Sequence, residues 1–337
     1  MDIKKAIEKV TGSKDLTEKE AYAVFDQIMS GKVTPAGISA FIVGLKMKGE
    51  TVDEITGAVR VMREKAVKIH VNGDEVVDTC GTGGSKTDTF NISTATAFVL
   101  AGCGVKVAKH GNRAASSRCG SADVLEKLGV KIDVPPKVTE ECIKRIDIGF
   151  MFAPMFHEAM KHAREVRKEI GVRTIFNILG PLCNPASSSC QILGVYEKSL
   201  TKKMAEVLKR VGTKRAFVVY GMDSLDEITI TDKTVVSELN KGKIRTYFID
   251  PKDFGLKKST LADIKGGSME ENASIIRAIL QGVKGPKRDI VLANTSVALV
   301  ACGKAKNFKE GVVLAAASID SGAAGEKLRS LVELTNA

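Results

Sequence analysis

The sequence predicts an α/β fold in which a central, mostly parallel sheet is flanked by helices and preceded by a small N-terminal α-helical domain. From about residue 76 onward, short apolar runs typical of buried strands alternate with apolar helical segments, as in parallel-sheet proteins. The first seventy residues have the pattern of a helical bundle. The length of 337 residues is long for one core and suits a large domain with a smaller one.

The N-terminal helices are predicted from their start signals. Thr17-x-x-Glu20 and Thr51-x-x-Glu54 are capping boxes, and Thr34-Pro35 supplies an N-cap with a proline at the first helical position. Apolar residues at helical spacing follow each signal. Helices this short need partners to bury their apolar faces, so we expect residues 1–70 to form the small helical domain.

A glycine-rich loop follows the first predicted strand, which ends at Val76-Val77. Gly81, Gly83 and Gly84 surround Thr82 in this loop. Backbone N–H groups can turn inward around an anion there, because no Cβ atoms stand in the way. A lone glycine cluster after a strand is usually only a tight turn. The loop has neither the Gly-Lys-Ser/Thr ending of a P-loop nor the spacing of the dinucleotide fingerprint.

Two further junctions nearby carry anion-binding groups. Asn91, Ser93 and Thr94 precede an apolar helical run, and hydroxyls at a helix start are either caps or anion ligands. The predicted strand 105–108 runs into Lys109-His110-Gly111-Asn112-Arg113, and Ser121 precedes the next helix. In open α/β sheets such segments meet outside the carboxyl ends of the strands. Together they favour a phosphate-binding site.

The rest of the chain continues the α/β pattern. Strand-like runs are expected at 148–152, 191–195, 216–220, 246–249 and 290–293. The run 178–185, interrupted by Gly and Pro, predicts a hinge between the two domains. We therefore assign residues 71–164 and 186–337 to the large domain, joined to the small one by a crossing segment near 165–185.

Asp226 and Glu227 follow the predicted strand 216–220. Mg²⁺ prefers one or two carboxylates together with phosphate and water oxygens. An Asp-Glu pair by itself is a weak indication, because such pairs are most often solvated surface. After a strand in a phosphate-binding α/β chain, this pair favours a Mg²⁺ site.

Composition limits the classes of function. No apolar run approaches the roughly 20 residues of a membrane span, and no signal peptide is expected. Seven cysteines without C-x-x-C pairing argue against disulfides and structural zinc, so we expect a cytoplasmic protein. A net charge of +11 fits either a nucleic-acid binder or an enzyme with an anionic substrate. The absence of tryptophan and the 5% aromatic content disfavour nucleic acid.

Several longer motifs carry a family resemblance that covers essentially the whole chain. These motifs are Gly81-Thr82-Gly83-Gly84, Thr89-Phe90-Asn91-Ile92-Ser93-Thr94, Lys109-His110-Gly111-Asn112-Arg113, Gly120-Ser121-Ala122-Asp123, and His157 with Arg167 and Gly171-Val172-Arg173-Thr174-Ile175-Phe176-Asn177. In them the chain resembles the anthranilate phosphoribosyltransferase family. The resemblance implies transfer of a phosphoribosyl group from phosphoribosyl pyrophosphate to the amine of anthranilate, in tryptophan biosynthesis. It also implies a homodimer joined through the helical domain.

The same resemblance implies roles for individual residues. Phosphoribosyl pyrophosphate would be bound by Gly81, Thr82, Gly83, Gly84, Ser85, Thr89, Asn91, Ser93, Thr94, Lys109 and Ser121. Anthranilate would be bound by Gly81, His110, Asn112, His157 and Arg167. Magnesium, with two ions per subunit, would be held by Ser93, Asp226 and Glu227. Catalysis would rest on positioning and electrostatics, without an assigned acid or base.

One position departs from the family pattern. The family's glycine loop typically reads Gly-Thr-Gly-Gly-Asp, whereas this chain has Ser85 at the fifth position. Serine keeps a hydroxyl but removes a negative charge from beside the pyrophosphate loop. The change either alters the Mg²⁺ dependence of the reaction or is silent, and the sequence leaves these alternatives open.

Two other functions are weighed against this one. A pyrimidine nucleoside phosphorylase has the same two-domain plan and binds phosphate at a similar glycine loop. The Asn-Ile-Ser-Thr and Lys-His-Gly-Asn-Arg runs and the Asp-Glu pair argue against it. A nucleic-acid-binding relative without transferase activity would suit the charge of +11, but the substrate motifs are intact.

Overall fold

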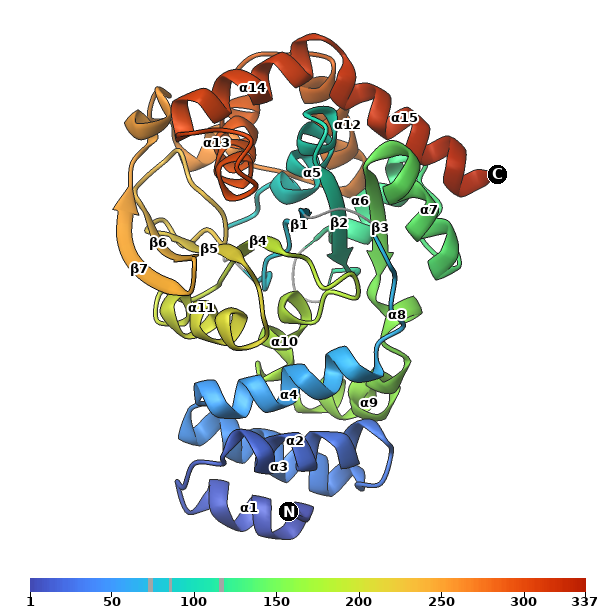
Figure 1. Cartoon of the computed structure of the whole chain (residues 1–337), viewed down its shortest axis with the longest axis vertical. Coiled ribbons are helices and arrows are strands. Elements are labelled where there is room, and N and C mark those ends of the chain that lie inside the picture. The colour runs from blue at the N-terminus through green and yellow to red at the C-terminus, as the bar shows by residue number, and fades with distance from the viewer. Residues whose placement is uncertain (72–74, 85–86, 115–117) are drawn as a thin grey trace.

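The computed structural model describes residues 1–71, 75–84, 87–114 and 118–337, with a helical bundle at one end and an α/β part at the other (Figure 1). The chain begins in the bundle, and its C-terminal helix lies on the α/β part. Helix α9 (Lys161–Ile170), from the middle of the chain, packs against α2 and α3. The bundle helices of the N-terminal segment are α1 (Ile3–Thr11), α2 (Glu18–Met29), α3 (Pro35–Lys48) and α4 (Val52–Lys65).

The described residues form one seven-stranded sheet in the order β3-β2-β1-β4-β5-β6-β7. Its strands are β1 (Val76–Asp78), β2 (Lys106–Gly111), β3 (Ile148–Phe152), β4 (Cys190–Gly194), β5 (Arg215–Gly221), β6 (Thr234–Asn240) and β7 (Lys243–Ile249). The first five strands pair in parallel, whereas β6 and β7 form an antiparallel edge. The strand order reverses between β1 and β4, and ligands bind at such a switch point in open α/β sheets.

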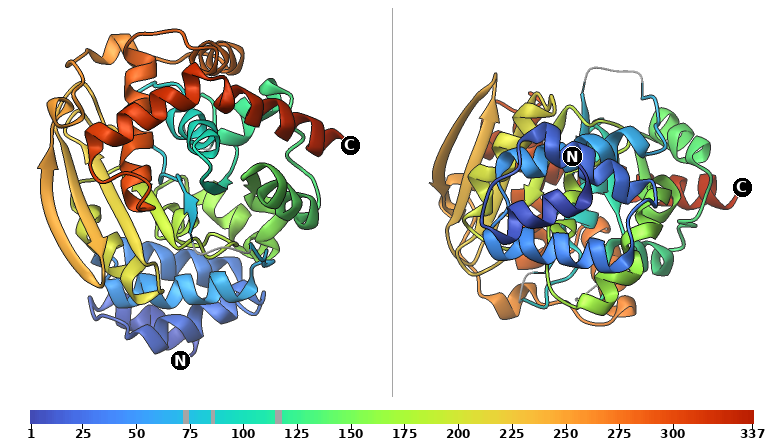
Figure 2. Two further views of the ribbon diagram at one scale, coloured as in Figure 1. Left: turned by 45° about the horizontal axis from the view of Figure 1, so that its top comes forward. Right: turned by 90° about the horizontal axis from the view of Figure 1, so that it is seen from below.

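Helices cover both faces of the sheet, and the C-terminal ones gather over one face (Figure 2). Phe217 of β5 packs with the apolar core of α5 and α13, whereas its neighbours Ala216 and Val218 face α11 and α4. This alternation follows from the two-residue period of a strand. The remaining helices are α5 (Ile92–Gly102), α6 (Ser121–Leu128), α7 (Pro136–Ile146), α8 (Ala153–Phe156), α10 (Phe176–Leu182), α11 (Leu200–Arg210), α12 (Met269–Leu280), α13 (Pro286–Ala301), α14 (Phe308–Asp320) and α15 (Ala323–Asn336). Short 3-10 turns lie at Glu158–Met160, Pro251–Phe254 and Leu261–Ile264.

The predicted fold class is confirmed, and so are the helix start signals. Thr17 and Thr51 form capping boxes with the Glu three residues later, and the Thr34 side chain accepts the N–H of Gly37 at 3.3 Å. A fourth bundle helix, α1, was not predicted. It begins after Asp2, whose carboxylate accepts the N–H of Lys5 at 3.0 Å.

Two local predictions were wrong. Residues 290–293 were expected as a strand but lie inside α13, which is buried over most of its length. A helix buried all round has no polar stripe, so a short apolar window of it resembles a buried strand. Residues 178–182 were expected in a hinge but belong to α10, with Pro181 in its last turn. A proline there removes only one backbone hydrogen bond, near a helix end where some backbone groups lack an intrahelical partner in any case.

Within the described ranges, none of the helices combines the length and apolar composition that crossing a bilayer requires.

Candidate active site

A cavity of about 960 Å³ lies at the carboxyl ends of the central strands, between the α/β part and helices α4 and α9. Of the residues predicted from the sequence, it brings together Gly81, Thr82, Gly83, Gly84, Thr89, Asn91, Ser93, Thr94, Lys109, His110, Asn112, Ser121, His157, Arg167, Asp226 and Glu227. Ser85 lies outside the described residues. Chain segments more than a hundred residues apart therefore meet in one space.

The glycine loop is fixed to the end of β4. The backbone N–H of Thr82 donates to the carbonyl of Gly194 at 2.8 Å, and the Thr82 hydroxyl accepts the N–H of Tyr196 at 3.1 Å. Gly83 and Gly84 have φ angles of +66° and +80°, a backbone conformation that residues with a side chain rarely adopt. The Arg173 guanidinium donates to the Gly84 carbonyl at 2.6 Å and lies over the Tyr196 ring. The loop is thus held at both ends by groups outside itself.

The Asp226 segment packs directly on two glycines. A Cβ on Gly81 would lie 3.0 Å from Oδ2 of Asp226, and a Cβ on Gly194 would overlap the Asp226 carbonyl oxygen. Gly194 therefore requires glycine for a packing reason, whereas at Gly81 the contact is tight and is made by the end of the Asp226 side chain. Gly194 was not predicted as a site residue, because a glycine at the end of a strand carries no chemical signal in the sequence.

Replacing Gly194 by alanine is expected to displace the Asp226–Glu227 segment and to lower activity together with stability. The overlap is with backbone, which cannot move aside like a flexible side chain, so we expect a loss of about 1–3 kcal/mol in unfolding free energy. Chemical denaturation and steady-state kinetics measure the two effects. Gly325→Ala is the control, because this helical glycine has only ordinary contacts nearby. Unchanged activity in Gly194→Ala would contradict the assignment.

Lys109 reaches from β2 toward the start of α5. Its Nζ donates to the carbonyl of Thr79 at 3.0 Å and lies 3.2 Å from the hydroxyl of Ser93. The side chain is buried at 3% exposure, and it lies at the wall of the cavity. The Lys109 ammonium acts on the carboxylates of Asp78 and Glu227, opposing the rise in pKa that burial causes in each, and brings positive charge to this wall of the cavity.

Helix α5 begins at Ile92, so Ser93 and Thr94 lie in its first turn and not before it as expected. The N-cap Asn91 makes no side-chain cap bond; its amide instead donates to the Cys119 carbonyl at 3.0 Å and its carbonyl oxygen accepts from Asn272 at 3.2 Å. The buried Thr94 hydroxyl has no hydrogen-bond partner among the described residues. Free N–H and hydroxyl groups at the start of a helix can bind an anion, because the helix dipole is positive there.

Asp226 and Glu227 are half-buried neighbours at the cavity wall. Burial and the charge of Asp226 raise the pKa of Glu227, although Lys109 and the backbone N–H of Ser93 act in the opposite direction. Two adjacent carboxylates resist joint ionisation until a cation neutralises them. Their hard oxygens suit Mg²⁺ completed by phosphate and water. Among the described residues, no group of three or more His, Cys, Asp or Glu side chains could enclose a metal by itself.

His110 and His157 form a neutral pair, with ring centroids 5.0 Å apart. Nδ1 of His110 lies 3.1 Å from the Gly180 carbonyl. Burial, with the neighbouring His157, lowers the pKa of His110 to about 3; burial and Lys68 lower the pKa of His157 to about 4. Nε2 of His110 and both ring nitrogens of His157 are buried without partners in the described part of the chain. Both residues line the cavity, and their rings are uncharged at neutral pH.

Arg167 lies on α9, on the opposite side of the cavity from the sheet. Its guanidinium lies over the ring of Phe176, 5.5 Å from the centroid, and burial lowers its pKa from the ordinary value. No carboxylate pairs with it within the described ranges. A half-buried guanidinium of this kind is available for a carboxylate ligand.

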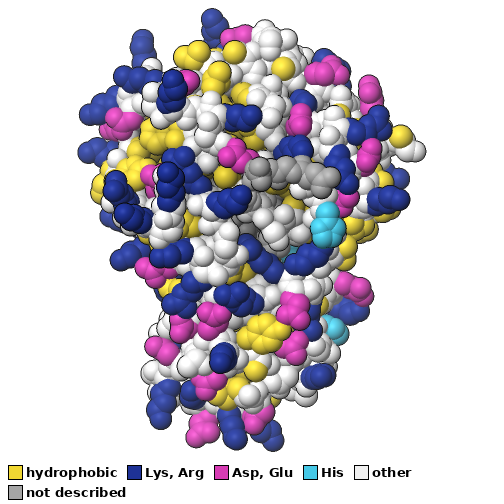
Figure 3. Space-filling view, viewed as in Figure 1, with side chains coloured by type: hydrophobic (Ala, Val, Ile, Leu, Met, Phe, Trp, Pro, Cys, Tyr) yellow, Lys and Arg dark blue, Asp and Glu magenta, His cyan; other side chains and the backbone are white. Residues whose placement is uncertain are grey.

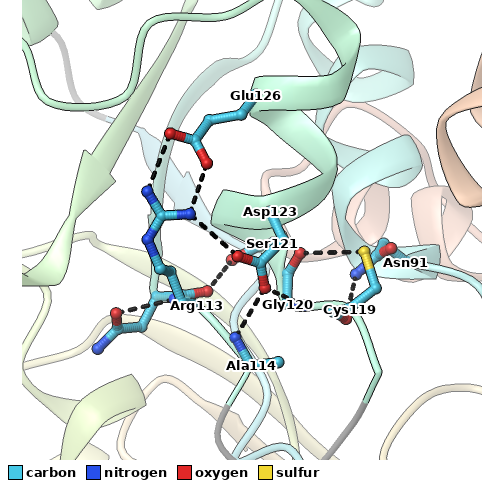
Figure 4. Close-up of polar contacts among 9 residues, drawn as sticks. Asn91, Arg113, Ala114, Cys119, Gly120, Ser121, Asp123 and Glu126 are labelled. Carbon is cyan, nitrogen blue, oxygen red and sulfur yellow. Dashed lines mark hydrogen bonds and ion pairs between the residues drawn. The ribbon is translucent and has the colours of Figure 1, made fainter. Parts of the chain in front are cut away.

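The segment that follows β2 is tied to α6 through Asp123, as Figure 4 shows. One oxygen of Asp123 accepts the N–H groups of Ala114 and Gly120, each at 2.9 Å, and the other accepts from Arg113 at 3.1 Å. Arg113 also pairs with Glu126, so its guanidinium is held against α6 at the edge of the cavity. The sequence analysis assigned no role to Asp123 or Asn272. Asp123 had a local signal, its capping position three residues after Gly120, whereas Asn272 had none.

Comparison with known proteins follows the same division of the chain. Residues 4–66 match the model of the glycosyl transferase family, helical bundle domain. Residues 73–325 match the model of the glycosyl transferase family, a/b domain. An anthranilate phosphoribosyltransferase of Citrifermentans bemidjiense is 55% identical over 99% of each chain. The chain therefore belongs to the anthranilate phosphoribosyltransferase family.

Solved structures of this family are similar throughout their length. The enzyme of Thermus thermophilus superposes with a TM-score of 0.93, at 42% identity over 98% of this chain and 99% of that one. The Saccharomyces cerevisiae enzyme in complex with PRPP and Mg gives 0.91, at 28% identity over 99% and 98%. The same yeast enzyme in complex with 4-fluoroanthranilate gives 0.89, at 27% identity over 99% and 97%.

Proposed function

We propose that the cavity residues divide the two substrates of this family's reaction between two sides of the cavity. Membership of the family makes the chain a transferase of tryptophan biosynthesis. The reaction moves the 5-phosphoribosyl group from phosphoribosyl pyrophosphate to the amine of anthranilate and releases pyrophosphate. The observation that carries the division is the position of the polar groups that line the cavity: the start of α5 and Lys109 lie on one side, and the neutral histidines and Arg167 lie on the other.

Phosphoribosyl pyrophosphate is assigned to the side formed by the glycine loop and the start of α5. Breaking the C1–O bond builds positive charge on the ribose and negative charge on the departing pyrophosphate, as in glycoside cleavage. Backbone N–H groups of the loop, other than that of Thr82, which donates to Gly194, are assigned to the pyrophosphate together with the Thr82 hydroxyl. Lys109 and the first turn of α5 supply positive potential in place of water. The assigned residues on this side are Gly81, Thr82, Gly83, Gly84, Thr89, Asn91, Ser93, Thr94, Lys109 and Ser121, with Ser85 assigned by sequence alone.

Mg²⁺ is assigned to Ser93, Asp226 and Glu227, with two ions per subunit. The binding of Mg by the yeast relative supports use of the ion, and the raised pKa of Glu227 supports a cation at this carboxylate pair. Bound there, Mg²⁺ supplies positive charge opposite the leaving pyrophosphate. The acidic residues themselves repel the substrate's phosphates, so they suit this position only together with a cation.

Anthranilate is assigned to the side lined by Gly81, His110, Asn112, His157 and Arg167. An arginine fork can grip its carboxylate with two parallel hydrogen bonds. The aromatic amine is already neutral, so attack at C1 needs no strong general base. The lowered pKa values of both histidines are in keeping with this, because they keep the rings uncharged beside the acceptor.

The test of the activity is loss of anthranilate fluorescence on incubation with phosphoribosyl pyrophosphate and Mg²⁺. We expect loss only when both substrates and the metal are present. Phosphate-dependent cleavage of thymidine, in place of anthranilate consumption, would identify the nucleoside phosphorylase alternative instead. A salt-sensitive shift of DNA without transferase activity would identify the nucleic-acid alternative. On the face shown in Figure 3, Lys and Arg are spread among acidic side chains and do not gather in one stripe.

A homodimer through the helical domain is the proposed assembly. Helix α3 is apolar on both faces: Ile38, Phe41 and Leu45 are buried inward. Ala36, Ala40, Val43 and Met47 form an outward stripe at helical spacing, and Met47 is 84% exposed. A helix that is apolar all round is normally buried all round, so a second copy of the chain is the proposed cover of this stripe.

Val43→Glu with Met47→Glu is expected to convert the protein to a monomer, because two charges would have to enter an apolar contact. Sedimentation velocity at several protein concentrations measures the change. Val283→Glu, at a site 57% exposed in the connection before α13, is the matched control and should leave the assembly unchanged. A wild-type protein that sediments as a monomer would contradict the proposal.

The domain limits and cellular location remain proposals as well. We assign residues 1–70 to the helical domain, with a crossing segment near 165–185, and residues 71–164 and 186–337 to the large domain. The packing of α9 on α2 and α3 supports the crossing segment. Seven cysteines, all of them free thiols, support a cytoplasmic location.

A further inference from the structure

Asp78 is a fully buried carboxylate to which the proposed mechanism gives no role. It ends β1 and has 0% exposure. Burial raises its pKa to about 6, although the Asn184 amide and the charge of Lys109 act in the opposite direction. A buried carboxylate costs stability unless hydrogen bonds compensate it, so its partners indicate what it does.

One partner is the backbone of β2. The β1–β2 ladder pairs Val76 with Lys106 and Val77 with Val107. Strand β2 continues along β3 as far as Gly111. Oδ1 of Asp78 accepts the backbone N–H of His110 at 3.3 Å. The carboxylate therefore holds the part of β2 that β1 no longer reaches.

The other partner is Asn184, in the connection between α10 and β4. Its amide nitrogen donates to Oδ2 of Asp78 at 2.8 Å and to the carbonyl of Ala108 at 2.9 Å. Its carbonyl oxygen accepts the N–H of Ala186 at 2.8 Å. Asn184 is itself 2% exposed. The Asp78–Asn184 pair thus joins the ends of β1 and β2 to the connection before β4.

The backbone held in this way carries one residue from each side of the cavity. Lys109 sends its Nζ to Thr79 and Ser93, on the side assigned to phosphoribosyl pyrophosphate. His110 turns its ring toward Gly180 and His157, on the side assigned to anthranilate. A shift of this short stretch of β2 would move both side chains at once.

We propose that Asp78 and Asn184 are positioning residues that fix Lys109 and His110 together, and so align the two substrates with each other. The inference rests on the roles proposed above for Lys109 and His110. It predicts a kinetic pattern that differs from that of a substrate contact: loss of Asp78 affects both substrates, whereas loss of a contact affects one.

The test is Asp78→Asn, with KM measured separately for each substrate. Asparagine has one carbonyl oxygen for two donors, so either the His110 N–H or the Asn184 amide is left facing another donor. We expect both KM values to rise and kcat/KM to fall by roughly 10- to 100-fold, as for other residues that orient a binding group.

Arg288→Met controls for general destabilisation. Arg288 is 5% exposed, donates to the Gly282 carbonyl and pairs with Asp320, and lies outside the cavity lining. It should lower the thermal midpoint with both KM values unchanged. The inference is overturned if Asp78→Asn behaves like Arg288→Met, with a lower thermal midpoint and both KM values unchanged. Should Asp78→Asn fail to fold, Asn184→Ala decides in its place: a rise in both KM values supports the inference, and unchanged values overturn it.

Lys109→Met and His110→Ala separate this inference from the roles on which it rests. Each should raise the KM of one substrate more than that of the other. If neither variant changes the kinetics, the assigned roles fail and the inference fails with them. If Lys109→Met and His110→Ala both change KM as expected while Asp78→Asn leaves both KM values unchanged, the roles stand and the positioning inference alone is wrong.

Discussion

Changing Asp226 and Glu227 together to alanine is expected to abolish Mg²⁺-dependent turnover while the fold survives. The two carboxylates lie in a loop at the cavity wall, and the charge of Asp226 contributes to the raised pKa of Glu227, so their removal relieves a repulsion. The charge that Mg²⁺ brings to a departing pyrophosphate contributes several kcal/mol, so kcat should fall by roughly 1,000-fold or more. Steady-state rates across a Mg²⁺ titration measure the loss.

Asp232→Ala is the matched control for this change. Asp232 follows in the same connection between β5 and β6, and its carboxylate lies 3.9 Å from the ammonium of Lys258 on the surface. The control should keep the wild-type Mg²⁺ profile. A double variant whose rate still follows Mg²⁺ as the wild type does would remove the metal from these carboxylates.

Arg167→Ala is expected to raise the KM for anthranilate far more than the KM for phosphoribosyl pyrophosphate. The guanidinium lies across the cavity from the phosphate side, without a carboxylate partner in the described part of the chain. Losing a hydrogen-bonded charge partner costs about 1.5–3 kcal/mol, or roughly 10- to 150-fold in KM. Initial rates with each substrate varied in turn measure the two constants.

The neighbouring Lys168→Ala separates this effect from a change in α9 itself. Lys168 is exposed and does not line the cavity, so both KM values should stay at the wild-type level. Arg167→Lys should recover little, because a lysine ammonium cannot grip a carboxylate through two parallel bonds. Equal rises in both KM values for Arg167→Ala would show that Arg167 acts through the fold or on the phosphate side.

The sequence predicted the architecture well where two independent local signals marked the same element. The capping boxes at Thr17 and Thr51 and the strand 148–152 appear where they were expected, because each combines a start or stop residue with an apolar period. The prediction of a strand at residues 290–293 was wrong for the opposite reason. Helix α13 is buried on nearly every side, so no polar face marks the 3.6-residue period of a helix. The length of β2 was also underestimated, because Lys109 and His110 are polar residues that continue the strand.

The sequence by itself determined which chemistry the chain can bring to a ligand. Glycines around Thr82, a lysine and a histidine at the end of a strand, two neighbouring acids and an arginine on a basic helix were all recognisable as residue types at fixed spacings. These features are local, and the parallel-sheet rule places them at one edge of the sheet. The family resemblance added the identity of the substrates to this list of groups.

Only the tertiary structure decided how these groups are held. Gly194 must lack a side chain because the Asp226 backbone packs on it, and Asp78 meets Asn184 across more than a hundred residues of sequence. Asn272 likewise acts through Asn91, a partner 181 residues away in the sequence. A residue that binds a ligand is revealed by its own chemistry, whereas a residue that positions another is defined by contacts, and contacts between distant segments exist only once the chain has folded.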